Sequence, residues 1–197
     1  MKKILFLMTL TLVFVSSLSA AKLKNTKLKV GDKAPLFSVP TILYKQFILF
    51  DELKKIKKED GLIIFDFFAS WCHACKEEFP DFNKIYEELK KKHIYFYGVG
   101  IDSKRSVLWK FVKKDIKVKF PVLFDQNAFK AGHKYGADTI LPQLFIIDKH
   151  GIVRKIAVGK IEDTANGLKA MIEKIKPGTF PKYKNVKVKT GKIDKKK

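Results

Sequence analysis

The stretch FDFFASWCHACKEEFPDF, residues 65–82, holds the only two cysteines of a 197-residue chain, Cys72 and Cys75. The apolar residues before the pair, rich in Ile and Phe, predict a buried strand. After the pair, apolar residues recur at helical spacing as far as Lys92, which predicts a helix that Pro80 should kink. The two cysteines are therefore expected where a buried strand gives way to a helix.

Three uses of such a cysteine pair can be weighed. A structural disulfide stabilises by closing a loop, and a loop of two intervening residues gains almost nothing. A structural zinc site needs four ligands, whereas His93, His133 and His150 are scattered along the chain. A reactive dithiol fits better, because the free N–H groups and the dipole at a helix start stabilise the thiolate of Cys72. Cys75, one turn along the same face, could then resolve a mixed disulfide formed on Cys72.

Asp66 and His73 are two titratable side chains that could tune this dithiol. Asp66 is the one charged residue of the apolar strand, and burial would raise its pKa enough for it to take the proton of Cys75 near neutral pH. The alternative is an acid that pairs with a lysine or points outward at a strand end. A protonated His73 beside Cys72 would stabilise the thiolate and make the pair more oxidising. The alternative is an exposed side chain of modest effect.

The rest of the chain alternates between strand and helix patterns. Ser103 is the expected N-cap of the helix predicted at 103–114. Further strands are predicted at 94–101, 121–125, 144–148 and 151–159, and further helices at 103–114, 127–135 and 161–175. The order β-α-β-α-β-α-β-β-α implies an α/β fold with a central mixed β-sheet flanked by helices on both faces.

The formal net charge of +21 favours anionic neighbours, so nucleic acid has to be considered as a partner. The first segment argues against it, because two lysines, an apolar run and small residues form the pattern of a secretory signal peptide over 1–21. The alternative is a retained membrane anchor, although the apolar run is shorter than the roughly 20 residues that span a bilayer. Either way we expect an exported protein, periplasmic or extracytoplasmic, soluble or N-terminally anchored, in a compartment that allows disulfide chemistry.

Composition divides the rest of the chain into three segments. A basic lead-in over 22–29 precedes a single domain at 30–178, and a lysine-rich tail follows at 179–197. The tail is interpreted as a solvated segment, and the alternative is contact with an anionic membrane surface or with a partner.

Eight short motifs occur in an order that matches one known family. They are VGDKAP at 30–35, ASWC at 69–72, CKEEFP at 75–80, FPVLFD at 120–125, YG at 135–136, LP at 141–142, FIID at 145–148 and VG at 158–159. With these motifs the chain resembles the TlpA/ResA-like thiol-disulfide oxidoreductases of the thioredoxin family. The resemblance implies a thioredoxin-like fold with an extra helix-and-strand insert from 101 to 125.

The resemblance also assigns roles to individual residues. These are Cys72 as the exposed nucleophile, Cys75 as the resolving thiol, Asp66 as the buried acid, Trp71 as a flanking aromatic, and Leu141 with Pro142 as a cis-proline loop facing the dithiol. The backbone of that loop pairs with the substrate chain in this family, as a short form of strand addition. No metal is expected, and no cofactor beyond a redox-active Cys72–Cys75 disulfide.

The family frame favours a reductant of disulfide-bearing protein substrates, apocytochrome c among them, that receives electrons from a membrane thiol donor. Ala74 replaces the proline that is usual before the second cysteine, and Leu141 replaces a threonine, so substrate choice and redox potential stay open. One alternative is a disulfide-forming oxidant or isomerase tuned by His73. Another, of a different class, is a non-catalytic or metal-delivery binding protein on the same fold. A thiol peroxidase is disfavoured, because no cysteine lies in a Pro-x-x-x-Thr-x-x-Cys frame.

Overall fold

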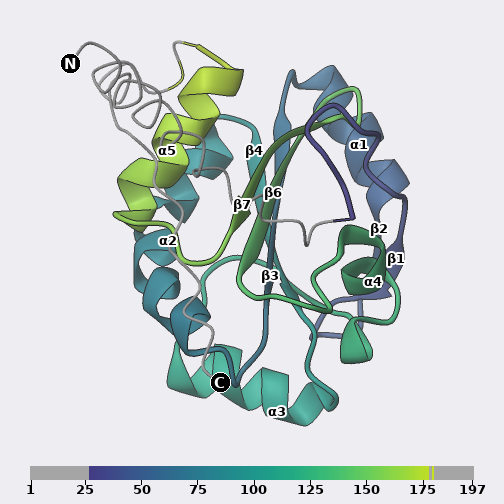
Figure 1. The fold of residues 1–197 in the computed structure, drawn as a ribbon, viewed down its shortest axis with the longest axis vertical. Coiled ribbons are helices and arrows are strands. Elements are labelled where there is room, and N and C mark those ends of the chain that lie inside the picture. The colour runs from purple at the N-terminus through teal and green to yellow at the C-terminus, as the bar shows by residue number, and fades with distance from the viewer. Residues whose placement is uncertain (1–26, 178, 180–197) are drawn as a thin grey trace, which may run out of the picture.

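A computed structural model describes residues 27–177 and 179, and a central five-stranded sheet organises them (Figure 1). Its strand order is β5-β4-β3-β6-β7. The strands are β3 Leu62–Phe68, β4 Ile94–Gly100, β5 Val122–Phe124, β6 Gln143–Asp148 and β7 Val153–Val158. The pairs β3–β4 and β4–β5 are parallel, whereas β3–β6 and β6–β7 are antiparallel. The sheet is therefore mixed, and its middle strand, β3, is buried along its whole length.

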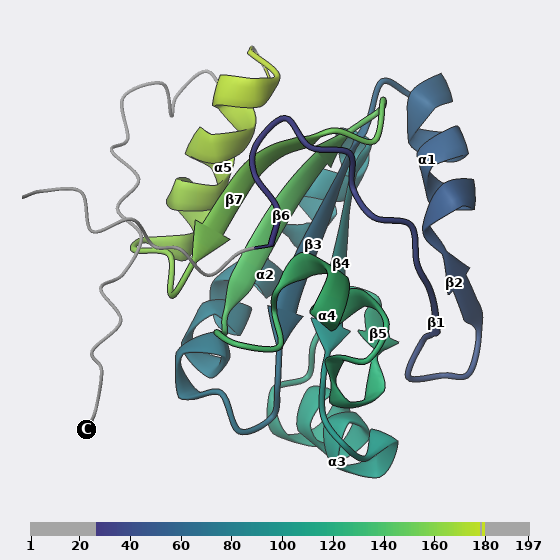
Figure 2. The same cartoon turned by 45° about the vertical axis from the view of Figure 1, so that its right-hand side comes forward.

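Helices cover both faces of this sheet (Figures 1 and 2). The pair α2 His73–Lys91 and α5 Thr164–Ile175 lies on one face, and α1 Leu49–Lys58 and α4 Ala131–Tyr135 lie on the other. The helix α3 Arg105–Lys110, continued by the π-helix Phe111–Asp115, crosses the end of the sheet at which β3 leads into α2. This arrangement confirms the predicted thioredoxin-like α/β class. None of the described helices is long and apolar enough to cross a membrane.

Three elements that the sequence patterns do not predict lie ahead of β3. A short antiparallel hairpin is formed by β1 Ser38–Pro40 and β2 Gln46–Ile48, and α1 follows directly. Only Leu49 and Ile56 of α1 are buried, which leaves most of this lysine-rich helix in solvent. The hairpin is too short to give a readable alternation of apolar and polar residues.

Three predicted helix starts need correction. The helix expected from Ser103 begins after Lys104, and no side chain caps it. The helix expected at 127–135 is interrupted, because Asn127 and Ala128 have positive φ angles of 53° and 57°. A 3-10 turn, Gln126–Ala128, therefore precedes the short α4. The last helix begins at Thr164 rather than at residue 161. The helix α2, by contrast, continues through Pro80 as one helix.

The alternation of side chains along β3 separates the core into two aromatic clusters. Phe65 and Phe67 point to the face of α4, where the ring centroid of Phe67 lies 5.3 Å from that of Tyr135. Phe68 points to the opposite face, with its ring centroid 4.9 Å from that of Phe79 in α2. Asp66, two residues before Phe68, faces the α2 side for the same reason.

The predicted segments at the two ends of the chain lie outside the described residues. The expected signal peptide or anchor over 1–21 is one of them, and the tail at 179–197 is described only at Thr179. In the lead-in over 22–29, Leu28 is buried against the domain.

Candidate active site

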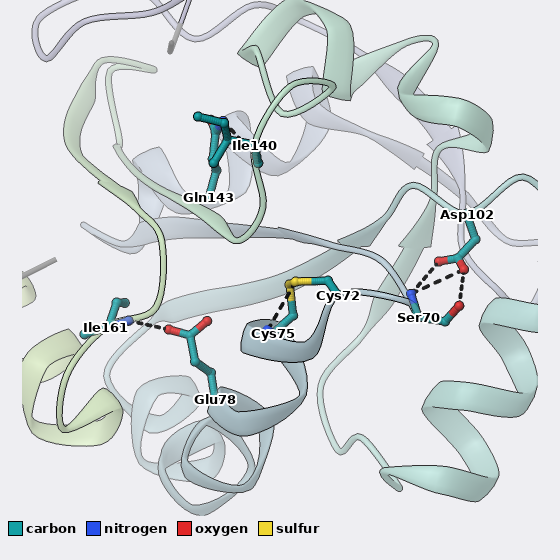
Figure 3. Close-up of a disulfide and its surroundings, with 8 residues drawn as sticks. All are labelled: Ser70, Cys72, Cys75, Glu78, Asp102, Ile140, Gln143 and Ile161. Carbon is teal, nitrogen blue, oxygen red and sulfur yellow. Dashed lines mark hydrogen bonds between the residues drawn. A yellow bond between two sulfur atoms is a disulfide. The ribbon is translucent and has the colours of Figure 1, made fainter. Parts of the chain in front are cut away.

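Cys72 and Cys75 form a disulfide at the start of α2 (Figure 3). Cys72 is the N-cap residue, with an extended backbone, and its Sγ accepts a hydrogen bond of 3.2 Å from the backbone N–H of Cys75. Cys72 retains 6% exposure, whereas Cys75 has 0%. Cys72 is therefore the more accessible of the two cysteines, and the N-terminal end of a 19-residue helix favours a thiolate at this position.

Asp102 fixes the loop that carries Cys72. Its buried carboxylate accepts a 3.1 Å hydrogen bond from the backbone N–H of Ser70 and another from the Ser70 hydroxyl (Figure 3). The residue before Asp102 also contacts this part of the chain, because the Ile101 N–H donates a 3.0 Å hydrogen bond to the Phe68 carbonyl. Sequence reasoning missed Asp102, because its partner is 32 positions distant in the chain.

Asp66 is 1% exposed, and neither of its carboxylate oxygens has a hydrogen-bond partner among the described residues. Burial raises its pKa well above the usual aspartate value, and the negative charge of Glu78 raises it further. The alternative in which Asp66 pairs with a lysine or points outward at a strand end is wrong. Such an isolated buried carboxyl is stable only when it holds a proton.

Glu78 is a second buried acid, which sequence reasoning missed. It lies one turn after Cys75 on the buried face of α2, and its Oε1 accepts a 2.8 Å hydrogen bond from the Ile161 N–H (Figure 3). Burial raises its pKa to about 7, although the Ile161 hydrogen bond and the charge of Lys160 act in the opposite direction. Its position three residues after Cys75, in line with Phe79 and Phe82, was the available signal.

His73 and Trp71 are exposed beside the disulfide. The imidazole of His73 is 86% exposed, and its Nε2 lies 3.2 Å from Oε1 of Glu77, one turn along α2. Glu77 also forms an ion pair with Lys160. The carboxylate of Glu77 would therefore offset part of any positive charge on His73. Trp71 is 70% exposed.

The cis-proline loop faces the disulfide across a groove of about 350 Å³. The Leu141–Pro142 peptide bond is cis, as the family resemblance implies. The groove is lined by Trp71, Cys72, His73, Ala74, Ile101 and residues 137–141. Gln143 stabilises the segment 136–141, because its buried amide donates 3.0 Å hydrogen bonds to the carbonyls of Gly136 and Ile140. Figure 3 shows this amide on the side of the loop away from the sulfur atoms.

Comparison with known proteins places this site in a family. Residues 30–156 match the AhpC/TSA family. The chain belongs to this family. It is 31% identical over 151 residues to thiol-disulfide oxidoreductase ResA of Bacillus cereus, a match that covers 77% of this chain and 81% of the relative. ResA of Geobacillus thermodenitrificans is 29% identical over 154 residues, a match that covers 78% of this chain and 82% of the relative.

Solved structures agree with these relatives. The crystal structure of a thiol:disulfide interchange protein DsbE from Chlorobium tepidum is 30% identical, with a TM-score of 0.64, and the match covers 74% of this chain and 96% of that one. The solution structure of a protein disulfide isomerase from Bacteroides thetaiotaomicron is 21% identical, with a TM-score of 0.66, and the match covers 81% of this chain and 98% of that one. At this identity the likeness supports the fold alone. The protein is therefore a thiol-disulfide oxidoreductase.

Proposed function

We propose that this oxidoreductase is exported and reduces disulfides of other proteins through Cys72 and Cys75. The observation that carries the proposal is the position of the pair. The more accessible sulfur lies at a helix start and opens on the groove beside Leu141. Two buried acids with raised pKa values, Asp66 and Glu78, lie on the elements that flank the buried sulfur.

Each reducing cycle begins with the dithiol form of the pair. The Cys72 thiolate attacks one sulfur of the substrate disulfide, so that a mixed disulfide forms and the other substrate sulfur leaves as a thiolate. Cys75 then loses its proton and attacks Sγ of Cys72. The second substrate sulfur leaves, takes up a proton, and the Cys72–Cys75 disulfide remains. A thiol donor must reduce that disulfide before the next cycle.

Asp66 and Glu78 supply a proton acceptor for the resolving step. Cys75 is fully buried, so solvent cannot take its proton directly. A carboxyl with a pKa of about 7, as at Glu78, is partly ionised near neutral pH and can accept and return a proton. Asp66 interacts electrostatically with Glu78, so the two acids titrate as a pair that shares this role.

The surrounding charges favour a reducing potential. Negative charge on Glu78, which is partly ionised near neutral pH, opposes a thiolate at the pair and so destabilises the reduced form. The imidazole of His73, which could act in the opposite direction, has its Nε2 3.2 Å from the carboxylate of Glu77, which would offset a positive charge there. We therefore expect a potential near or below thioredoxin's value of about −270 mV, whereas a value near about −120 mV would favour the oxidant or isomerase alternative.

The biological setting follows from the sequence. The segment 1–21 has the pattern of a signal peptide, so substrates and a membrane thiol donor would meet the protein outside the cytoplasm. Apocytochrome c, with its Cys-x-x-Cys-His site, is the candidate substrate, because an extended chain could lie in the groove between Trp71 and Leu141. The tail at 179–197 could add contact with the membrane surface.

Trapping of mixed disulfides tests the proposal directly. In the full chain, Cys75→Ala should leave Cys72 joined to its substrate, because the resolving thiol is missing, and the partner can be identified by mass spectrometry. Cys72→Ala is the matched control and should trap nothing. A Cys75→Ala protein that accumulates no partner would contradict substrate reduction. Stoichiometric metal on the reduced protein, without disulfide reduction, would favour the metal-delivery alternative.

A further inference from the structure

The segment that crosses the end of the sheet has a large excess of basic residues, which α2 does not have. Residues 103–119, which include α3 and the π-helix, contain seven Lys or Arg residues and a single acid, Asp115. In α2, by comparison, four lysines are balanced by five acids. Leu108, Phe111 and Val112 pack into the core, and so the basic side chains of the segment face solvent.

Apolar side chains are exposed in the same place. Val107 is 46% exposed and Trp109 is 40% exposed, and across a groove of about 400 Å³ the turn between β1 and β2 presents Leu43 at 58% and Tyr44 at 78%. Arg105 joins the two sides, because its guanidinium lies 4.3 Å from the ring centroid of Tyr44 and donates a hydrogen bond to the Thr41 carbonyl. We call this surface the α3 patch; it comprises Leu43, Tyr44, Val107, Trp109, Lys104, Lys110, Lys113 and Lys114.

The lysines of the α3 patch have no acidic partner within the described part of the chain. None of its four lysines takes part in any ion pair there. Lys114 instead lies 5.8 Å from the ring centroid of Trp109. A set of unpaired cations around exposed aromatic and aliphatic side chains is complementary to an anionic, partly apolar surface.

The residue types favour lipid over protein as that surface. Protein interfaces are depleted in lysine, whereas this patch contains four lysines. Anionic phospholipids attract clustered lysines without a fixed geometry, and Trp and Tyr side chains settle at the level of the headgroups. We propose that the α3 patch docks the protein on a membrane that contains anionic phospholipids.

The placement of the patch gives such docking a consequence. The chain enters α3 directly after Ile101, which lines the disulfide groove, and Asp102, which holds the Cys72 loop. Docking through the α3 patch would therefore bring the disulfide end of the domain toward the bilayer. The inference goes beyond thiol exchange, and it is independent of the direction of electron transfer.

Vesicle binding by the full chain tests the proposal. We would measure sedimentation with phosphatidylcholine vesicles, with and without about one third phosphatidylglycerol, for three proteins: the natural sequence, Lys110→Glu/Lys113→Glu/Lys114→Glu, and the control Lys57→Glu/Lys90→Glu/Lys91→Glu. The control makes the same change in net charge near the C-terminal ends of α1 and α2. The preference for anionic over neutral vesicles is the readout, because any contribution of residues 1–26 to apolar binding enters both measurements.

We expect the α3 variant to lose about 100-fold of that preference and the control variant less than about threefold. An equal loss in both variants would overturn the proposal, as would a natural sequence without preference for anionic vesicles. Binding to soluble poly-glutamate in place of vesicles would assign the α3 patch to an acidic polypeptide and overturn the lipid proposal. Insulin reduction in solution, which the α3 variant should retain, separates loss of docking from loss of thiol exchange.

Discussion

Asp66 and Asp125 are two aspartates of almost equal burial that occupy opposite chemical situations. Asp66 is 1% exposed and Asp125 is 2% exposed. The carboxylate of Asp125 accepts hydrogen bonds of 2.9, 2.7 and 2.7 Å from the backbone N–H groups of Lys130, Ala131 and Gly132. The carboxylate of Asp66 accepts none from any described residue.

The difference separates an acid whose charged form is stabilised by the backbone from one whose charged form is not. Backbone donors stabilise a carboxylate and fix the segment that carries them, as Asp125 does for the start of α4. An acid without donors is destabilised by burial in its charged form, so the pKa of Asp66 rises well above the ordinary aspartate value. Burial alone therefore does not identify a functional acid, and the absence of hydrogen-bond partners is the feature that distinguishes Asp66 from Asp125.

The largest effect is expected for Asp66→Asn. The amide has nearly the same shape but cannot exchange a proton with Glu78, so the pair loses its shared acceptor and resolution of the mixed disulfide should slow between about 100- and 1,000-fold at pH 7. Rapid-quench trapping of the mixed disulfide measures that step. The first attack by Cys72 should keep its rate, which serves as the internal control. A resolving step of unchanged rate would remove Asp66 from the mechanism.

Asp125→Ala tests whether Asp125, unlike Asp66, stabilises the fold. The substitution leaves three backbone N–H groups near α4 without their acceptor, and we expect a loss of about 3 kcal/mol in the free energy of unfolding. Urea denaturation of the oxidised protein measures it. Asp66→Asn, in the same experiment, should not destabilise the fold. Equal destabilisation by both substitutions would contradict the view that Asp125 stabilises the fold and Asp66 does not.

Glu78 links the buried acids to the pH dependence of stability. Its pKa rises from 4.5 to about 7 on folding, so its contribution to stability is complete below about pH 4.5 and is lost as the pH rises through 7. Between pH 5 and pH 7, this group should lower the free energy of unfolding of the oxidised natural protein by about 2 kcal/mol, and Glu78→Gln should not show that loss. Denaturant unfolding at both pH values checks this. Glu77→Gln, at an exposed position of the same helix, should leave the decline in place.

His73→Ala should have the smallest effect. The side chain is exposed and its ion pair with Glu77 lies on the helix surface, where such pairs contribute little. We expect the potential of the Cys72/Cys75 pair to shift by no more than about 10 mV. Equilibration with a thiol buffer measures the shift. A change of more than about 30 mV toward reducing values would restore the interpretation in which His73 makes the pair oxidising.

The sequence was sufficient for the elements whose patterns are local. The apolar run around Asp66 predicted β3, and the helical spacing after Cys72 predicted α2. The loop at Leu141 and Pro142 came from the family resemblance. Glu78, Asp102 and Gln143 were missed, because their partners lie far away in the chain or on backbone atoms that no motif specifies. The break before α4 was missed as well, since positive φ angles at Asn127 and Ala128 leave only a weak trace in residue type.

Asp66 and Glu78 interact electrostatically, so we expect them to titrate as a pair, and the titration of each can be observed separately. A carbon NMR titration of the labelled side-chain carboxyls of Asp66 and Glu78, in the oxidised protein so that no thiol titrates, tests this most directly. We expect Glu78 to titrate at a pKa of about 7 and Asp66 to stay protonated well above the ordinary aspartate range. Titration of both carboxyls near about pH 4, where exposed carboxyls titrate, would contradict this expectation.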